Sequence, residues 1–422
     1  MAYTKKEIKK GIKLHFLKTD KFKTDLVAIL ITTPLKKETV TKNAVLTSVL
    51  RRGSKTRQTM DKISIELENM YGAEFDCGIE KLADNHILKF YLESVNDSYI
   101  PEESNVLEKN IEIISEIALD PYVESNRFKQ EYVLQEKENI KQLIEGKKDD
   151  KDQYAFERCI EEMYKEKPHG IYRYGYLEDL NAITPESLYE YYKELIKTAK
   201  IDIFISGELD NEKITNYINN ISYIKNLNER EPEYIKDHPE NETREEQLIE
   251  ESLDITQGKL VLGLKIDHPD TSIRYAGAVY NAILGGSANS KLFQNVREKE
   301  SLAYTIGSRF IRQKNNIYIK GGIDLDKFDK ALEVIKQQME DIKKGNFSEE
   351  EINNAKIFLE SNIKMLEDEQ DLMITYYIGQ ELSDSNQTVD SYLEEIKKIT
   401  KQQIIEIANK TIIDTIYFLK NI

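Results

Sequence analysis

The side chains that could bind a catalytic metal are few in this sequence. They are five histidines and two cysteines, at positions His15, His86, His169, His238, His268, Cys77 and Cys159. Protein zinc sites use imidazole, thiolate and carboxylate ligands, and catalytic sites almost always include His or Cys. No two of these histidines stand at helical spacing, and neither cysteine has another Cys or His near it in the sequence. The sequence therefore predicts no metal ligand in this chain, with a site assembled from dispersed residues as the alternative.

Two of the histidines fall in turn sequences. His169 lies between Pro168 and Gly170, and His268 precedes Pro269. Proline and glycine mark turns, where a lone histidine is usually exposed. We expect His169 and His268 at the protein surface.

Arg297 and Tyr304 carry side chains that could hydrogen-bond a ligand, although a structural role for each is favoured on the residues alone. The guanidinium of arginine offers several donors in a rigid fork to a carbonyl or carboxylate, and the hydroxyl of tyrosine can hydrogen-bond a developing oxyanion. Their separation (304 − 297) is about two helical turns, so both lie on one face if the helix persists. The alternatives are a surface ion pair of Arg297 with Glu300 and a core position for Tyr304.

The segment that contains Arg297 and Tyr304 resembles an earlier segment of the same chain. An offset of 233 residues (286 − 53 and 304 − 71) superposes the Gly53–Ser54 and Gly286–Ser287 steps and also Tyr71 and Tyr304. The glycines 285 and 286 follow an apolar helical segment, so they indicate a turn and not a phosphate loop. The repeat predicts two copies of one large domain.

Composition sets the domain boundaries and excludes some partners. The chain has 422 residues, enough for two domains, with 40% hydrophobic residues. Residues 226–247 are polar and acidic, which predicts a linker between domains at 1–225 and 248–422. The net charge of -16 argues against nucleic-acid binding. No apolar run reaches membrane-spanning length, and we expect a cytoplasmic protein.

Hydrophobic patterns predict strands and helices in the same order in both halves. Strands are expected at 12–17, 26–33, 74–79, 86–92, 201–206, 259–266, 304–311, 316–323 and 411–419, and helices at 42–52, 59–70, 103–117, 124–144, 184–197, 271–283 and 289–300. This grouping predicts α+β domains with helices on one face of a mainly antiparallel sheet.

The order of elements, the linker and the segment Leu292–Tyr304 resemble the pitrilysin/insulinase family of zinc metallopeptidases, which includes mitochondrial processing peptidase. The resemblance covers nearly the whole chain. It implies two duplicated domains that form a half-clamshell, and a peptide chamber enclosed by two such halves. It also assigns substrate binding to Arg297 and Tyr304.

The resemblance implies an inverted zinc motif, His-x-x-Glu-His, on the helix before Gly53. Counting back from Gly53 places Ala44 and Ser48 at the histidine positions and Thr47 at the position of the general base. None of these side chains can perform the family role, so no catalytic residue and no metal are expected in this chain. Glu136 matches the third ligand, but a solvated residue on a charged helix is the favoured interpretation.

These observations lead to one main hypothesis and two alternatives. The chain is expected to be a non-catalytic subunit that binds an extended peptide at a sheet edge, while a homologous partner with an intact motif supplies zinc. The alternatives are a peptide-binding or assembly scaffold without proteolysis, and a self-sufficient metallopeptidase with unusual ligands. Heterodimer and homodimer stay open.

Overall fold

The computed structural model describes residues 2–101, 104–236, 245–267 and 273–422. They form two compact units. Unit 1 draws on Met1–Gly146, Ile171–Ile235 and Glu369–Leu382, and unit 2 on Lys147–Gly170, Lys236–Asp368 and Ser383–Ile422. Each unit therefore combines segments from both halves of the sequence. The prediction instead gave two continuous domains, 1–225 and 248–422, joined by a linker at 226–247.

Unit 1 is built on one large sheet. Its strands are β1 (Ala2–Lys9), β2 (Ile12–Lys18), β3 (Thr24–Pro34), β4 (Glu74–Leu82), β5 (Asn85–Val95) and β8 (Lys200–Gly207). They lie in the order β1-β2-β8-β3-β5-β4, and only β2 and β8 run parallel. The central strand β3 is apolar along most of its length because both of its faces are covered. A small ribbon is formed by β6 (Val123–Glu124) and β7 (Arg127–Phe128).

Unit 2 repeats this sheet. Its strands are β9 (Gln247–Ser252), β10 (Gly258–Ile266), β11 (Ala303–Ile311), β12 (Asn316–Ile323) and β13 (Thr411–Lys420). Read from β9, the order is β9-β13-β10-β12-β11, and only β9 and β13 run parallel. This order and these directions match β2-β8-β3-β5-β4 of unit 1. The duplication and the α+β class predicted from the sequence are thus confirmed.

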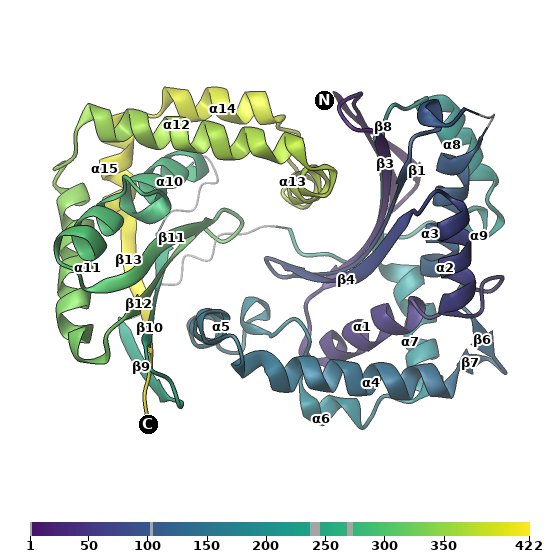
Figure 1. Ribbon diagram of the computed structural model, residues 1–422, viewed down its shortest axis with the longest axis horizontal. Coiled ribbons are helices and arrows are strands. Elements are labelled where there is room, and N and C mark those ends of the chain that lie inside the picture. The colour runs from purple at the N-terminus through teal and green to yellow at the C-terminus, as the bar shows by residue number, and fades with distance from the viewer. Residues whose placement is uncertain (1, 102–103, 237–244, 268–272) are drawn as a thin grey trace. The chain divides into compact units, whose positions relative to one another are not determined.

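The helices of unit 1 pack mainly on one face of its sheet (Figure 1). They are α1 (Lys37–Leu50), α2 (Met60–Asn69), α3 (Val106–Leu119), α4 (Gln130–Glu145), α6 (Leu177–Leu180), α7 (Pro185–Thr198), α8 (Asn211–Asn220) and α9 (Ser222–Lys225). The start of α7 was readable from sequence because Thr184 caps it and forms a reciprocal capping box with Ser187.

The helices of unit 2 from the second half of the sequence are α10 (Arg274–Asn281), α11 (Phe328–Lys343), α12 (Glu349–Met365), α14 (Val389–Lys398) and α15 (Lys401–Lys410), with π-helical turns η5 (Ala282–Gly286) and η6 (Phe293–Lys299). A capping box of Ser348 and Glu351 starts α12. Among the described helices of both units, none is long and apolar enough to cross a membrane.

One helix in each unit comes from the other half of the sequence. Helix α13 (Gln370–Leu382) covers the second face of the unit 1 sheet, and its yellow-green ribbon lies beside purple strands in Figure 1. Helix α5 (Lys151–Met163) packs on β10 and β13 of unit 2. Helix α5 lies in the first half of the sequence but belongs to unit 2, and α13 lies in the second half but belongs to unit 1. Neither half of the sequence therefore contains all the helices that cover its own sheet.

Buried charges hold α13 on the sheet. The side chain of Glu381 is only 4% exposed and forms ion pairs with Lys5 at 2.8 Å, Lys200 at 3.4 Å and Lys13. Burial alone would raise the pKa of Glu381, but the three lysines outweigh it and hold that pKa well below its usual range. Gln370 at the other end of α13 donates to the carbonyl of Thr24.

A second set of polar side chains continues this cluster inside the sheet. His15 is fully buried, with Nε2 2.8 Å from Asp202 and Nδ1 2.8 Å from the hydroxyl of Tyr3. Lys200 also pairs with Asp202. The Tyr3 ring stacks on Tyr377 of α13. Strand β1 and helix α13, which lie at opposite ends of the sequence, are therefore joined through one network.

The start of the predicted linker is fixed to unit 1. Arg230 is buried and donates to the carbonyls of Asn228 and Ile196. Asn85 exchanges two hydrogen bonds with the backbone of Ile235, at 2.6 and 2.7 Å. Its polar composition predicts a linker that does not pack on a domain, but in the structure the polar side chains themselves make the contacts.

Candidate functional site

Helix α1 carries the three positions that the resemblance assigned to the zinc motif. Ala44 is buried in the core of unit 1. The hydroxyl of Thr47 donates to the carbonyl of Asn43 at 2.9 Å, and that of Ser48 donates to the carbonyl of Ala44 at 3.3 Å. Both hydroxyls therefore satisfy carbonyls of their own helix. The helix ends before Gly53, where a Cβ atom would lie 2.6 Å from the carbonyl oxygen of Gln58.

Glu136 lies beside the end of α1, and the expected solvated position is wrong. Its side chain is 7% exposed and pairs with Arg52 through Oε1. Its other oxygen accepts a hydrogen bond from Asn139 at 2.9 Å. Sequence patterns missed this pair because the partners are distant in the chain. The available signal was that Ser48 and Arg52 share one helix face at i, i+4 spacing.

These residues do not fit a zinc ion. Zinc needs several nitrogen, sulfur or carboxylate ligands, whereas the motif positions hold a methyl group and two hydroxyls. The one carboxylate, Glu136, already has an arginine and an amide as partners. In the parts of the chain that the structure describes, no group of three or more His, Cys, Asp or Glu side chains is arranged to hold a metal ion.

The described histidines are buried in separate places. His15 lies in the α13 cluster, and His86 accepts a hydrogen bond from the amide of Asn43 at 3.0 Å. His169 is buried at the edge of the Tyr164 ring, so the predicted surface position is wrong. The turn is present, as η3 (Pro168–Gly170), but it folds inward. His238 and His268 lie outside the described residues.

Replacing His86 by glutamine should reduce the loss of unfolding free energy that the protein shows as the pH falls below neutrality. Burial lowers the pKa of His86 to about 3, while an unfolded histidine has a pKa of about 6.5. The neutral side chain therefore contributes stability that is complete above the unfolded pKa and is lost as the pH falls toward the folded one. Urea unfolding should show wild type losing about 1.4 kcal/mol from this group between pH 7.5 and 5.5.

Asp25 supplies the matched control because it acts in the opposite direction. Burial raises the pKa of Asp25 to about 6, so its protonation adds stability as the pH falls below that value. Asp25→Asn should therefore steepen the acid loss, whereas His86→Gln should reduce it. A His86→Gln curve parallel to that of wild type would contradict the assignment.

Arg297 and Tyr304 lie together in unit 2. The Nε atom of Arg297 donates to the backbone carbonyl of Tyr304 at 3.0 Å. The two residues do not share a helix face, because η6 ends at Lys299 and Ser301 adopts a left-handed φ of 50°. Tyr304 is the second residue of β11. The turn, and not helical periodicity, brings the pair together.

The core position for Tyr304 is wrong, whereas Arg297 does form a surface ion pair, although with a different glutamate. Arg297 forms its ion pair with Glu298 at 3.0 Å and not with Glu300, and its side chain stays 40% exposed. Tyr304 is 60% exposed, and its counterpart Tyr71 is 63% exposed, so neither is a core aromatic. Both positions of the repeat thus present a tyrosine to solvent.

The hydroxyl of Tyr304 already has a partner. It donates to Asp324 at 2.9 Å, and Lys327 pairs with the same carboxylate at 2.7 Å. The hydrogen bond to Asp324 raises the pKa of Tyr304. Tyr304 therefore stays protonated at neutral pH. In this arrangement its oxygen can accept from a peptide N–H, and it can donate to a carbonyl only after leaving Asp324.

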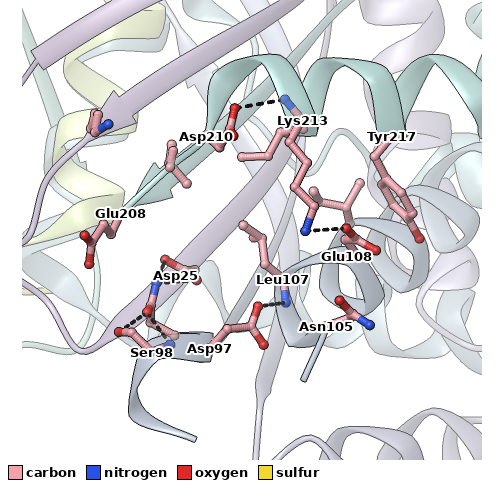
Figure 2. A pocket seen from close by; sticks show the side chains of 15 residues that line it. Asp25, Asp97, Ser98, Asn105, Leu107, Glu108, Glu208, Asp210, Lys213 and Tyr217 are labelled. Atoms are coloured by element: carbon pink, nitrogen blue, oxygen red, sulfur yellow. Dashed lines mark hydrogen bonds and ion pairs between the residues drawn. The ribbon is translucent and has the colours of Figure 1, made fainter. Parts of the chain in front are cut away.

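Unit 1 also has a pocket of about 420 Å³ at the ends of α3 and α8 (Figure 2). Its acidic groups serve the local fold. Asp97 accepts from the backbone N–H of Val106 at 2.8 Å at the start of α3, and Glu108 pairs with Lys213 at 3.0 Å. Asp25 accepts from Asn96 at 2.9 Å. These three carboxylates are therefore engaged in holding the structure of unit 1.

Known proteins share this architecture. A family model described as "Peptidase M16 inactive domain" matches residues 182–359. The "Probable inactive metalloprotease YmfF" of Bacillus subtilis is 32% identical over 411 residues, 97% of this chain and 96% of that protein. The "Uncharacterized zinc protease YmfH" of the same bacterium is 29% identical over 180 residues, 41% of this chain and 39% of that protein.

A solved structure agrees with this assignment. The crystal structure of a conserved protein from Enterococcus faecalis superposes with a TM-score of 0.87 at 28% identity, covering 100% of this chain and 99% of that one. The duplicated sheets, the segment with Arg297 and Tyr304 and a relative similar over almost the full length lead to one conclusion. This chain belongs to the peptidase M16 family, the pitrilysin/insulinase metallopeptidases.

Proposed function

We propose that this chain is the non-catalytic, substrate-binding subunit of a heterodimeric M16 peptidase in the cytoplasm. Its partner is a homologous chain with an intact His-x-x-Glu-His helix. One observation carries the proposal: the zinc-motif positions hold Ala44, Thr47 and Ser48 with Glu136 paired to Arg52, while Arg297 and Tyr304 remain exposed. The chain has lost the ligands and kept the groups that would contact a peptide.

The comparisons support a pair of unlike chains. Bacillus subtilis holds both a relative named as a probable inactive metalloprotease and one named as a zinc protease. The first is similar to this chain over nearly its full length, while the second is similar over a smaller part. A chain of the first type needs a chain of the second type if the complex is to hydrolyse peptides.

The geometry of unit 2 suggests how a peptide would bind. Strand β11 ends the sheet order, so its outer backbone groups have no strand partner among the described residues. Such an edge can pair with an extended peptide. Tyr304 is the second residue of this strand, and the side chain of Arg297 donates to the Tyr304 carbonyl. A peptide added along β11 would therefore pass beside both side chains.

In the proposed complex, zinc in the partner would supply the activated water. The guanidinium of Arg297 donates hydrogen bonds to a peptide carbonyl, and these bonds stabilise the negative charge that develops on that oxygen in the transition state. Tyr304 supplies a second polar contact next to it. Because both residues act on the peptide and not on the metal, they can be tested separately from metal binding.

The proposal is tested by purifying the tagged chain from its native cells and identifying co-purifying proteins by mass spectrometry. A partner of similar size with an intact motif is expected, and the mixed complex should hydrolyse peptides that neither chain cleaves alone. Recovery of the chain by itself, or of a partner with which it binds peptide without hydrolysis, would instead support the scaffold. Zinc bound to the isolated chain at about one equivalent with chelator-sensitive hydrolysis would support the self-sufficient enzyme.

A further inference from the structure

We infer that the guanidinium of Arg52 supplies the positive charge that a metal ion would otherwise place beside Glu136. Arg52 therefore excludes a divalent cation from this chain even if the ligands of the zinc motif are restored. The inference concerns unit 1 alone. It does not depend on a partner or on the substrate role of Arg297 and Tyr304.

The first observation is the position of Arg52. Ala44, Ser48 and Arg52 are spaced at i, i+4 and i+8, so they follow one side of α1 and of the turn after it. That side faces α4, because the guanidinium of Arg52 reaches Glu136 on α4. Arg52 therefore extends the same face that carries two of the motif positions.

The second observation is burial. The Arg52 side chain is 18% exposed and that of Glu136 is 7% exposed. A carboxylate taken from water needs an opposite charge and hydrogen bonds to both oxygens. Arg52 supplies the charge and Asn139 the second hydrogen bond. These are the functions that a bound cation would otherwise perform at this carboxylate.

The third observation is the fixed orientation of the guanidinium. A second nitrogen of Arg52 lies 3.5 Å from the sulfur of Met60 on α2, so the group contacts both α4 and α2. The thiol of Cys77 lies beside α1 and points at the carbonyl of Thr47 at 3.7 Å.

The inference is tested by zinc binding to the full chain. The variant Ala44→His/Thr47→Glu/Ser48→His restores the motif, and its zinc affinity is measured by competition with a chromophoric chelator, with and without Arg52→Met. Removing the adjacent positive charge should tighten zinc binding by about 100-fold. Equal zinc affinity with and without Arg52 would overturn the inference.

If the restored variant does not fold, a double-mutant cycle tests the pairing of Arg52 with Glu136 on which the inference rests. Arg52→Met alone should lower the Tm by about 5 °C, because it leaves Glu136 buried without a counter-charge. Adding Glu136→Gln should recover most of that loss. The exposed pair Arg127 and Glu186 is the matched control, and the same cycle there should show little coupling. Losses at Arg52 and Glu136 that simply add would refute the pairing.

Discussion

Arg297→Ala is expected to lower the kcat of the proposed peptidase complex by about 100-fold, or ~2.7 kcal/mol, without preventing assembly. The guanidinium is exposed and lies against the carbonyl of Tyr304 on the edge strand β11. A donor aimed at a developing oxyanion contributes more in the transition state than in the ground state. Steady-state kinetics on the complex, with size-exclusion chromatography to confirm assembly, measure both parts of the expectation.

Tyr304→Phe should have a smaller effect, about 10-fold, because its hydroxyl must first leave Asp324 to donate to a substrate. Arg309→Ala is the matched control, since it removes an arginine from the same strand without touching the pair. Unchanged turnover in both Arg297→Ala and Tyr304→Phe would remove the proposed substrate roles. It would leave the chemistry of the zinc-motif positions, and the Arg52 inference, unaffected.

Glu381→Leu is expected to destabilise unit 1 by about 3–5 kcal/mol. The substitution leaves Lys200 buried with one fewer counter-charge and releases Lys5 and Lys13 from α13. Losing one member of a buried ionic group costs far more than losing a surface ion pair. Hydrogen exchange should show lost protection in α13 first, and urea unfolding should report the change in free energy.

A surface pair provides the comparison for Glu381. Glu360 pairs with Lys364 at 2.7 Å along one helix, where the glutamate is 35% exposed. Glu360→Leu should therefore change the free energy of unfolding by less than about 0.5 kcal/mol. If Glu381→Leu behaves like Glu360→Leu and α13 keeps its protection, the buried charges do not hold this helix.

Local patterns predicted most of the sheet from sequence. The strands at 26–33, 86–92 and 316–323 are recovered within β3, β5 and β12 because β-branched and apolar residues dominate them. Strand β1 was missed because its sequence is rich in lysine and only its pairing with β2 keeps it extended. Strand β9 was missed because it begins inside a polar segment.

The arrangement of the site depended on partners that are distant in sequence. Arg52 and Glu136 are 84 positions apart, and Lys5 and Glu381 are 376 apart. Nothing in the residues around Glu136 distinguishes a buried carboxylate from a solvated one. The resemblance located Glu136 next to the motif helix, whereas the charge that occupies this place became visible only in three dimensions.

The exchange of α5 and α13 has a consequence for synthesis on the ribosome. All the strands of the unit 1 sheet have been synthesised once residue 207 is added, but α13 ends at Leu382. At a translation rate of ~5–20 residues per second, the interval between the synthesis of the last strand and the synthesis of α13 is on the order of ten seconds or more. During this interval Asp202 and Lys200 lack their final cover, so newly made chains should be strong clients for chaperones.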